Sequence, residues 1–243
     1  MNLKEDAARA ACDLVQSGML LGLGTGSTAT LVVREIGRRM REGKLRDLRG
    51  VPTSEAIARV AREEGIPLVS LEEAPNLDLT LDGADEVDPS WNLIKGIGGS
   101  LLREKIVAQA TRCEAIVVDG AKLVQRLGER SPLPVEVIPF GWSSQLDYLR
   151  SLGGDPVLRR TADGHPFVTD EGNYTIDIRF GNPPARAGSL GGAPPGPVGL
   201  SDPPALDAAL RRRAGIVETG LFLGLTAILV VASDQGTQVR RKS

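Results

Sequence analysis

The chain of 243 residues has room for one large α/β domain, or for a medium-sized domain joined to a small one. Hydrophobic residues make up 41% of the chain and aromatic residues only 3%, so the core must be built from Leu, Val, Ile and Ala. The net charge of −2 excludes a broad basic surface for nucleic acid or an anionic membrane, so an anionic ligand must be held by a few local groups.

The first 130 residues alternate between strand and helix patterns. Short apolar runs predict strands at 19–23, 51–53, 66–71, 77–81 and 115–119. Apolar residues at helical spacing predict helices at 3–16, 27–40, around 57–61 and at 101–110. This alternation predicts βαβ units, and hence an α/β fold with a Rossmann-like, mostly parallel sheet.

The pattern changes near Ser131. A strand at 133–139, a helix at 142–152 and strands within 156–180 precede a Pro/Gly-rich stretch at 181–204, which we expect to be an exposed, mobile loop. Ser201 or Asp202 then caps a helix that Pro203 opens and that ends near Gly215.

The apolar stretch 215–232 is interrupted by Glu218, Gly220 and Gly224, so two short strands explain it better than a membrane span. We expect the last strand, 226–232, to return to the large domain. The predicted organisation is therefore a Rossmann-like catalytic domain of residues 1–130 plus 225–243, and a smaller α+β, ferredoxin-like domain of residues 131–224.

Cysteine and histidine are too scarce for several kinds of chemistry. Cys12 and Cys113 cannot form a disulfide framework or a Cys-rich zinc site, and together with an acidic N-terminal segment they favour the cytoplasm. The single histidine, His165, lies between Gly164 and Pro166, far from any motif, which argues against histidine-dependent catalysis.

The first motif is a glycine-rich turn, Gly22–Thr28, with the sequence GLGTGST. It follows a predicted strand and opens a predicted helix, where free N–H groups and the helix dipole favour a phosphate. It lacks the lysine of a P-loop and the third glycine of a dinucleotide fingerprint. The alternative is a tight turn with a Ser/Thr helix cap.

The second motif places four acids, Asp82, Asp85, Glu86 and Asp88, after the predicted strand 77–81. Ligands bind at the carboxyl ends of strands in open α/β sheets, so Asp82 and Asp85 can face one cleft. Two alternatives remain: a Mg²⁺ site, or a solvated turn that caps a helix.

The third motif is Lys95–Lys105, in which a lysine precedes a glycine-rich loop and a predicted helix. Glu104 falls near the start of that helix, so it is a candidate general base beside a loop that approaches substrate. The alternative is a surface glutamate that pairs with a neighbour one helical turn away.

Together these segments resemble ribose-5-phosphate isomerase, type A. The similarity rests on the segments GLGTGSTA (22–29), LDGADEVDP (81–89), NLIKGIGGSLLREKIVA (92–108), VVDGAKLV (117–124), PLPVEVIPFG (132–141) and, more weakly, VTDEGNYTIDI (168–178). The resemblance implies an aldose–ketose isomerase of the non-oxidative pentose phosphate pathway. Such an enzyme converts ribose 5-phosphate to ribulose 5-phosphate through an enediolate, without a metal or other cofactor, and is a homodimer or homotetramer.

The resemblance also assigns roles. It makes Glu104 the base that moves a proton between C2 and C1, while Asp82, Asp85 and Lys95 assist ring opening and hold the hydroxyls and the enediolate oxygen. The implied substrate-binding residues are Thr25, Gly26, Ser27, Thr28, Gly98, Gly99, Lys122 and Lys4. A lysine ammonium beside the developing oxyanion removes the need for a metal.

Two features depart from the family pattern. Ile97 stands where a small residue is usual, so we expect altered loop flexibility, and 181–204 is longer than expected. Among alternatives, an amino-sugar phosphate deaminase would need a catalytic histidine, and an acyl-CoA transferase would not need Lys95 beside the loop. A sugar-phosphate sensor, the effector half of a transcription regulator, would have no need for Glu104. It would also come with a basic N-terminal helix-turn-helix, which the sequence does not show.

Overall fold

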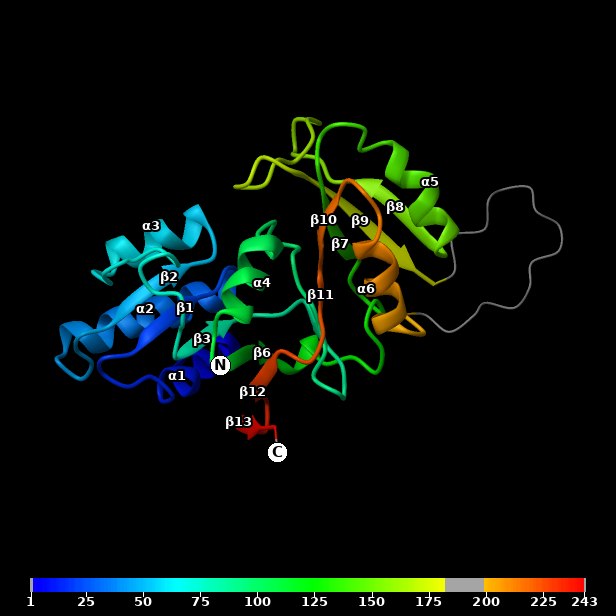
Figure 1. Cartoon of the computed structure of the whole chain (residues 1–243). Helices are drawn as coiled ribbons and strands as arrows, with labels where there is room; N and C mark the ends of the chain where they lie inside the picture. Colours follow the sequence, from blue (N-terminus) through cyan, green and yellow to red (C-terminus); the bar gives the residue numbers. More distant parts are fainter. Residues whose placement is uncertain (1, 182–198, 243) are drawn as a thin grey trace. The chain divides into compact units, whose positions relative to one another are not determined.

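The structure is a computed structural model that describes residues 2–181 and 199–242 (Figure 1). Most of the predicted loop at 181–204 therefore lies outside the described residues. The chain forms two compact units: Met1–Ala84, Arg103–Lys122 and Gly224–Ser243 make the first, and Asp85–Leu102 and Leu123–Leu223 make the second.

A six-stranded sheet organises the first unit, in the order β13-β12-β6-β3-β1-β2. Its strands are β1 (Leu20–Leu23), β2 (Arg49–Pro52), β3 (Leu79–Asp82), β6 (Glu114–Asp119), β12 (Thr226–Ser233) and β13 (Gly236–Arg241). All neighbouring strands are parallel except β13, which pairs antiparallel with β12. The predicted α/β fold with a parallel central sheet is confirmed, and β12 joins this sheet as expected.

Helices cover the sheet: α1 (Leu3–Cys12), α2 (Ser27–Arg41), α3 (Glu55–Glu63) and α4 (Leu101–Gln109). The aliphatic core beneath them includes Ala7 and Ala11 of α1 and Val32 and Ile36 of α2. Since alanines form much of the α1 face, α1 can approach α2 closely, and Cys12 is fully buried with its thiol donating to the Val32 carbonyl at 3.5 Å.

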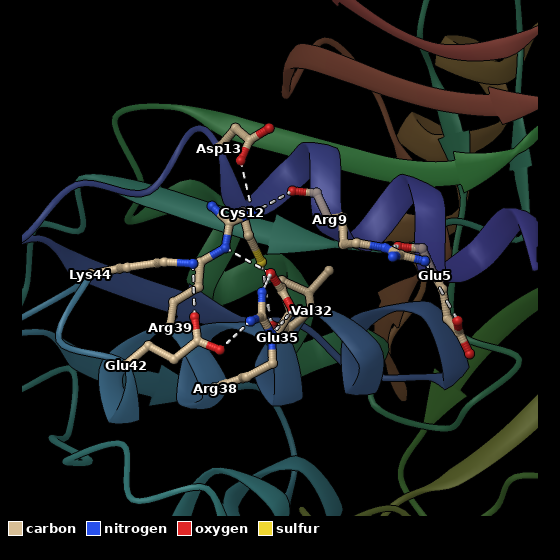
Figure 2. Close-up of polar contacts among 10 residues, drawn as sticks. All are labelled: Glu5, Arg9, Cys12, Asp13, Val32, Glu35, Arg38, Arg39, Glu42 and Lys44. Atoms are coloured by element: carbon tan, nitrogen blue, oxygen red, sulfur yellow. Dashed lines mark hydrogen bonds and ion pairs between the residues drawn. The ribbon is translucent and has the colours of Figure 1, made fainter.

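Charged side chains tie α1 to α2 at the edge of this core (Figure 2). Arg39 lies 2.8 Å from both Asp13 and Glu35, and Arg38 forms a second ion pair with Glu35. The hydrogen bond from Arg38 is the main reason that the pKa of Glu35 falls to about 2.

The second unit contains a four-stranded antiparallel sheet in the order β10-β7-β9-β8 and a three-stranded sheet in the order β11-β5-β4. The strands are β4 (Glu86–Val87), β5 (Leu93–Ile94), β7 (Leu133–Val137), β8 (Gly154–Leu158), β9 (Tyr174–Phe180), β10 (Ile216–Thr219) and β11 (Leu221–Phe222). The described part of this unit also contains the helices α5 (Ser144–Ser151) and α6 (Pro203–Arg211). Asp202 caps α6 as predicted, since its side chain accepts the Ala205 N–H at 3.0 Å.

The predicted strand at 66–71 is wrong. Only one bridge forms there, between Gly50 and Leu68, because Pro67 has no N–H to donate to a ladder. The hairpin of β4 and β5 was not predicted either, because strands of two residues are too short to show periodicity. Among the described residues, no helix combines the length and apolar character needed to cross a membrane.

Candidate active site

The glycine-rich turn connects β1 to α2 at the carboxyl end of β1. A Cβ added to Gly22 would lie 1.9 Å from Thr80 Oγ1, and one added to Gly24 would lie 2.2 Å from the Asp82 carboxyl group. Side chains of β3 therefore pack directly on the turn's backbone, which only glycine permits. Gly26, at φ +106°, precedes α2, whose first N–H groups have no acceptor inside the helix. This backbone arrangement favours an anion.

Thr25 connects this turn to the neighbouring strands. Its N–H donates to Asp82 Oδ1 at 3.1 Å, and its hydroxyl lies 2.7 Å from Thr53 Oγ1 and 2.8 Å from Ser54 Oγ. Ser54 also caps α3 by accepting the Ile57 N–H at 3.1 Å. Sequence reasoning missed Thr53 and Ser54, although a Thr-Ser pair between a strand and a helix is a typical cap signal. Their hydroxyls extend the polar surface of the turn.

Two predicted lysines lie in the same unit as the turn. Lys4 of α1 donates from Nζ to Ser27 Oγ at 2.9 Å, so α1 brings a positive charge to the start of α2, where Thr28 also lies. Lys122 ends the short 3₁₀ turn η1 (Gly120–Lys122) that follows β6. Because β6 and β3 are parallel neighbours, Lys122 lies at the carboxyl edge of the sheet.

Glu104 lies in the first turn of α4 and is buried, with 5% of its surface exposed. Val107, one helical turn further on the same face, is so close to β1 that a Cβ on Gly22 would lie 2.7 Å from it. At the other end of α4, the Ala110 carbonyl accepts the N–H of Leu77, which precedes β3. The helix therefore runs antiparallel to the strands, and its first turn, with Glu104, lies toward their carboxyl edge.

Asp82 is the last residue of β3 and is 1% exposed. Its Oδ1 accepts two backbone hydrogen bonds, from Thr25 N–H at 3.1 Å and from Gly83 N–H at 2.7 Å. A carboxylate held by two backbone donors has a fixed orientation beside the glycine-rich turn. The structure thus brings Asp82, Thr25 and the start of α2 together.

Two other acids of the second motif, Glu86 and Asp88, bind backbone groups within the second unit. Glu86 is buried, and its carboxylate accepts backbone N–H groups of Gly128, Arg130 and Ser131 at 2.5 to 2.7 Å. Asp88 accepts two backbone N–H groups within the β4–β5 hairpin at 2.8 Å. These two acids therefore organise loops. In the described part of the chain, no group of three or more His, Cys, Asp or Glu side chains could hold a metal ion.

In the second unit, Asp85 and Lys95 flank the β4–β5 hairpin and lie across from each other. Asp85 N–H donates to the carbonyl of Ile94, and Asp85 Oδ2 accepts the N–H of Ile97 at 3.0 Å. Lys95 is 2% exposed, and its Nζ lies 5.5 Å from the centre of the Phe222 ring. Both predicted polar residues thus lie at the ends of one hairpin.

Residues 96–99 form a tight turn directly after Lys95. Gly99 N–H donates to the Gly96 carbonyl at 3.0 Å, and both glycines have positive φ, at +85° and +109°. Gly98 is exposed at the tip, and Gly99 lies against the ring of Phe167 so closely that a Cβ would be 2.3 Å from it. The side chain of Ile97 is 46% exposed, so the turn accommodates the unusual residue by directing it outward.

The chain is similar in sequence to known proteins of one family. The family model described as Ribose 5-phosphate isomerase A (phosphoriboisomerase A) matches residues 49–236. The ribose-5-phosphate isomerase A of Chloroflexus aurantiacus is 50% identical over 235 residues, which cover 97% of this chain and 91% of the relative. That of Roseiflexus castenholzii is 49% identical over 230 residues, which cover 95% and 91%.

Solved structures of the same family share the fold of this chain. Ribose 5-phosphate isomerase A from Methanocaldococcus jannaschii matches with a TM-score of 0.87 and 37% identity, covering 99% of both chains. A D-ribose-5-phosphate isomerase in complex with phospho-erythronic acid matches with a TM-score of 0.89 and 33% identity over 100% of both chains.

Proposed function

The chain belongs to the ribose-5-phosphate isomerase A family, and on this basis we propose that it interconverts ribose 5-phosphate and ribulose 5-phosphate. The observation that carries the proposal is the buried Glu104 at the start of α4, at the sheet edge that also presents the glycine-rich turn and Asp82. A positioned carboxylate beside an anion-binding turn is what proton abstraction from a phosphorylated sugar requires.

The turn at 25–28 binds the substrate through its phosphate. The N–H groups that open α2, together with the hydroxyls of Ser27 and Thr28, act as donors, and Lys4 already lies within hydrogen-bonding distance of Ser27. Lys122, at the same sheet edge, adds a second positive charge. The hydroxyl of Thr25 is engaged with Thr53 and Ser54, so its contribution is the shape of the turn rather than a direct contact.

Glu104 carries the proton between C2 and C1. When its carboxylate removes the C2 proton of the open-chain aldose, negative charge develops on the carbonyl oxygen at C1. The hydroxyl proton on O2 then moves to O1, and return of the carbon proton to C1 leaves C2 as the carbonyl of the ketose. Lys95 stabilises that oxygen as the enediolate forms, and Asp82 and Asp85 assist ring opening and bind hydroxyls, with Gly98 and Gly99 allowing close approach of the backbone. A solved relative binds phospho-erythronic acid, whose carboxylate resembles an enediolate in charge and shape, which supports this chemistry.

The setting of the reaction is part of the proposal. We expect a homodimer or homotetramer in the cytoplasm that needs no cofactor and binds neither nucleic acid nor membranes. The scarcity of cysteine supports the expected cytoplasmic location, and the net charge of −2 supports the expectation that neither nucleic acid nor membranes are bound. Light scattering of the purified protein measures the oligomeric state directly.

The decisive experiment is conversion of ribose 5-phosphate in D₂O, followed by NMR. Proton transfer through an enediolate allows exchange at the carboxylate, so we expect deuterium at C1 of ribulose 5-phosphate. Product that forms without any deuterium would indicate an internal hydride shift instead. Absence of conversion by the folded protein would reject the proposed function.

A further inference from the structure

The turn at 96–99 is held by a side chain that lies some sixty residues away in the sequence. Arg159, directly after β8, donates from Nη1 to the carbonyl oxygens of Gly96 and Ile97, each at 3.0 Å. One Nη atom carries two hydrogens, so both bonds form at once. Because the N–H of Ile97 is bound to Asp85, the backbone of this turn is held from both sides.

Arg159 is itself fixed by its neighbours. Asp177 of β9 accepts from Nε at 2.9 Å and from Nη2, a two-point ion pair in which only 13% of the arginine side chain is exposed. The guanidinium carbon lies 5.6 Å from the centre of the Phe167 ring, which also packs against Gly99. With Nε and Nη2 bound to Asp177, the remaining Nη1 group is directed toward the turn.

We propose that Arg159, oriented by Asp177 and Phe167, is a positioning residue that fixes the 96–99 turn and, through it, Lys95 and Asp85 for the isomerase reaction. This inference rests on the proposed function. The physical reason is that Gly96 and Gly99 leave the turn with high conformational freedom, which has to be removed if adjacent polar groups are to keep one geometry. Three hydrogen bonds to the turn's backbone, two from Arg159 and one to Asp85, remove that freedom.

The expected signature is a loss of turnover with little loss of binding. Phosphate binding is assigned to the 25–28 turn of the first unit, whereas Lys95 directly precedes the 96–99 turn that Arg159 binds. A misplacement of about 1 Å in catalytic geometry can lower the rate about 10²-fold. In the Arg159→Lys variant, a single ammonium group replaces the planar guanidinium. It therefore cannot bind Asp177 at two points and donate to two carbonyls at the same time.

The test compares Arg159→Lys, Arg159→Ala and Asp177→Asn with a matched control, Arg160→Ala. Arg160 is the adjacent arginine and donates to the Gly164 carbonyl at 2.7 Å in an exposed loop. We measure kcat and KM for ribose 5-phosphate and a thermal melt for each variant. We expect kcat to fall about 10-fold or more in the Arg159 variants, with KM changing less than about threefold and the control unchanged. Added guanidinium should restore part of the kcat of Arg159→Ala but none of that of Glu104→Gln.

Several results would overturn this role. Arg159→Lys and Asp177→Asn variants that melt normally and keep kcat within twofold of the wild type would contradict it. So would a fall in kcat that only follows the fraction of unfolded protein, without guanidinium rescue. If Arg159→Ala does not fold, the two milder variants decide. A wild-type protein without isomerase activity would reject the proposed function instead.

Discussion

Glu104 combines two properties that a surface glutamate does not share. It is buried, yet it lies in the first turn of α4, where the helix dipole favours a negative charge. A buried carboxylate on the first turn of a helix is held in one position, which proton transfer to and from a bound sugar requires.

Replacing Glu104 with Gln isolates the proton-transfer step. The amide keeps the size of the side chain but cannot accept the proton from C2, so we expect kcat to fall at least about 10²-fold while KM changes little. The measurement is steady-state kinetics on ribose 5-phosphate beside a thermal melt. Glu63→Gln, an exposed change on α3, serves as the control and should leave both constants unchanged. A folded Glu104→Gln variant that keeps more than about a tenth of the activity would move the role of base to Asp82 or Asp85.

At the scale of elements, the β1–α2 turn is proposed to bind the substrate's phosphate, which does not change during the reaction. Phosphate contacts are the same in the ground state and the transition state, so their loss raises KM and leaves kcat comparatively unaffected. We expect this result for Thr28→Val, which removes one hydroxyl from the first turn of α2. Thr30→Val, two residues further along the same helix, is the control for a general effect of valine on α2. A fall in kcat at unchanged KM would contradict the assignment of this turn to the phosphate.

The ion pairs that Glu35 forms with Arg38 and Arg39 within α2 predict how stability depends on pH (Figure 2). Since the pKa of Glu35 is about 2 in the folded protein and near 4.5 when unfolded, its ionised form stabilises the fold above pH 4.5. That contribution is lost as the pH falls from about 4.5 to 2. We expect Glu35→Gln to lower the free energy of unfolding by about 0.5–1 kcal/mol at pH 7.

The measurement for Glu35 is urea unfolding of both proteins between pH 7 and pH 2.5. The difference between the two unfolding free energies should shrink steadily below pH 4.5, because the unfolded wild-type carboxyl group is then protonated and must release a proton on folding, a cost that Gln does not have. A difference that stays constant across this range would show that Glu35 stabilises α2 by packing alone.

At the scale of the whole molecule, the proposed chemistry distributes positive charge over lysines rather than a metal ion. Lys95 is buried on the β4–β5 hairpin, and a cation there can neutralise a developing oxyanion. We therefore expect full isomerase activity after exhaustive dialysis against EDTA, measured with metal content determined in parallel. Activity that disappears on chelation and returns with Mg²⁺ or Zn²⁺ would instead favour a metal role for the acidic segment.

Much of this molecule could be predicted from the sequence where the signal is local. The helical spacing in α2, the buried apolar run of β6 and the Asp202–Pro203 start of α6 depend on residues close together in the chain, and each prediction agrees with the structure. The glycine-rich turn could likewise be predicted from residues close together in the chain. Its glycines are required by the close approach of Thr80 and Asp82, and a helix must follow for an anion to be bound.

What only the tertiary structure decided is which distant groups meet. The sequence singled out Asp82 and Asp85 among four neighbouring acids, but it could not show that Glu86 binds three backbone N–H groups more than forty residues away or that Asp85 binds the turn at Ile97. Arg159 carries no sequence signal at all, because its partners come from a different strand and a different loop. Local patterns determine secondary structure through backbone conformation and periodicity, whereas a long side chain finds its hydrogen-bond partner only after sheet pairing has set the register of the strands.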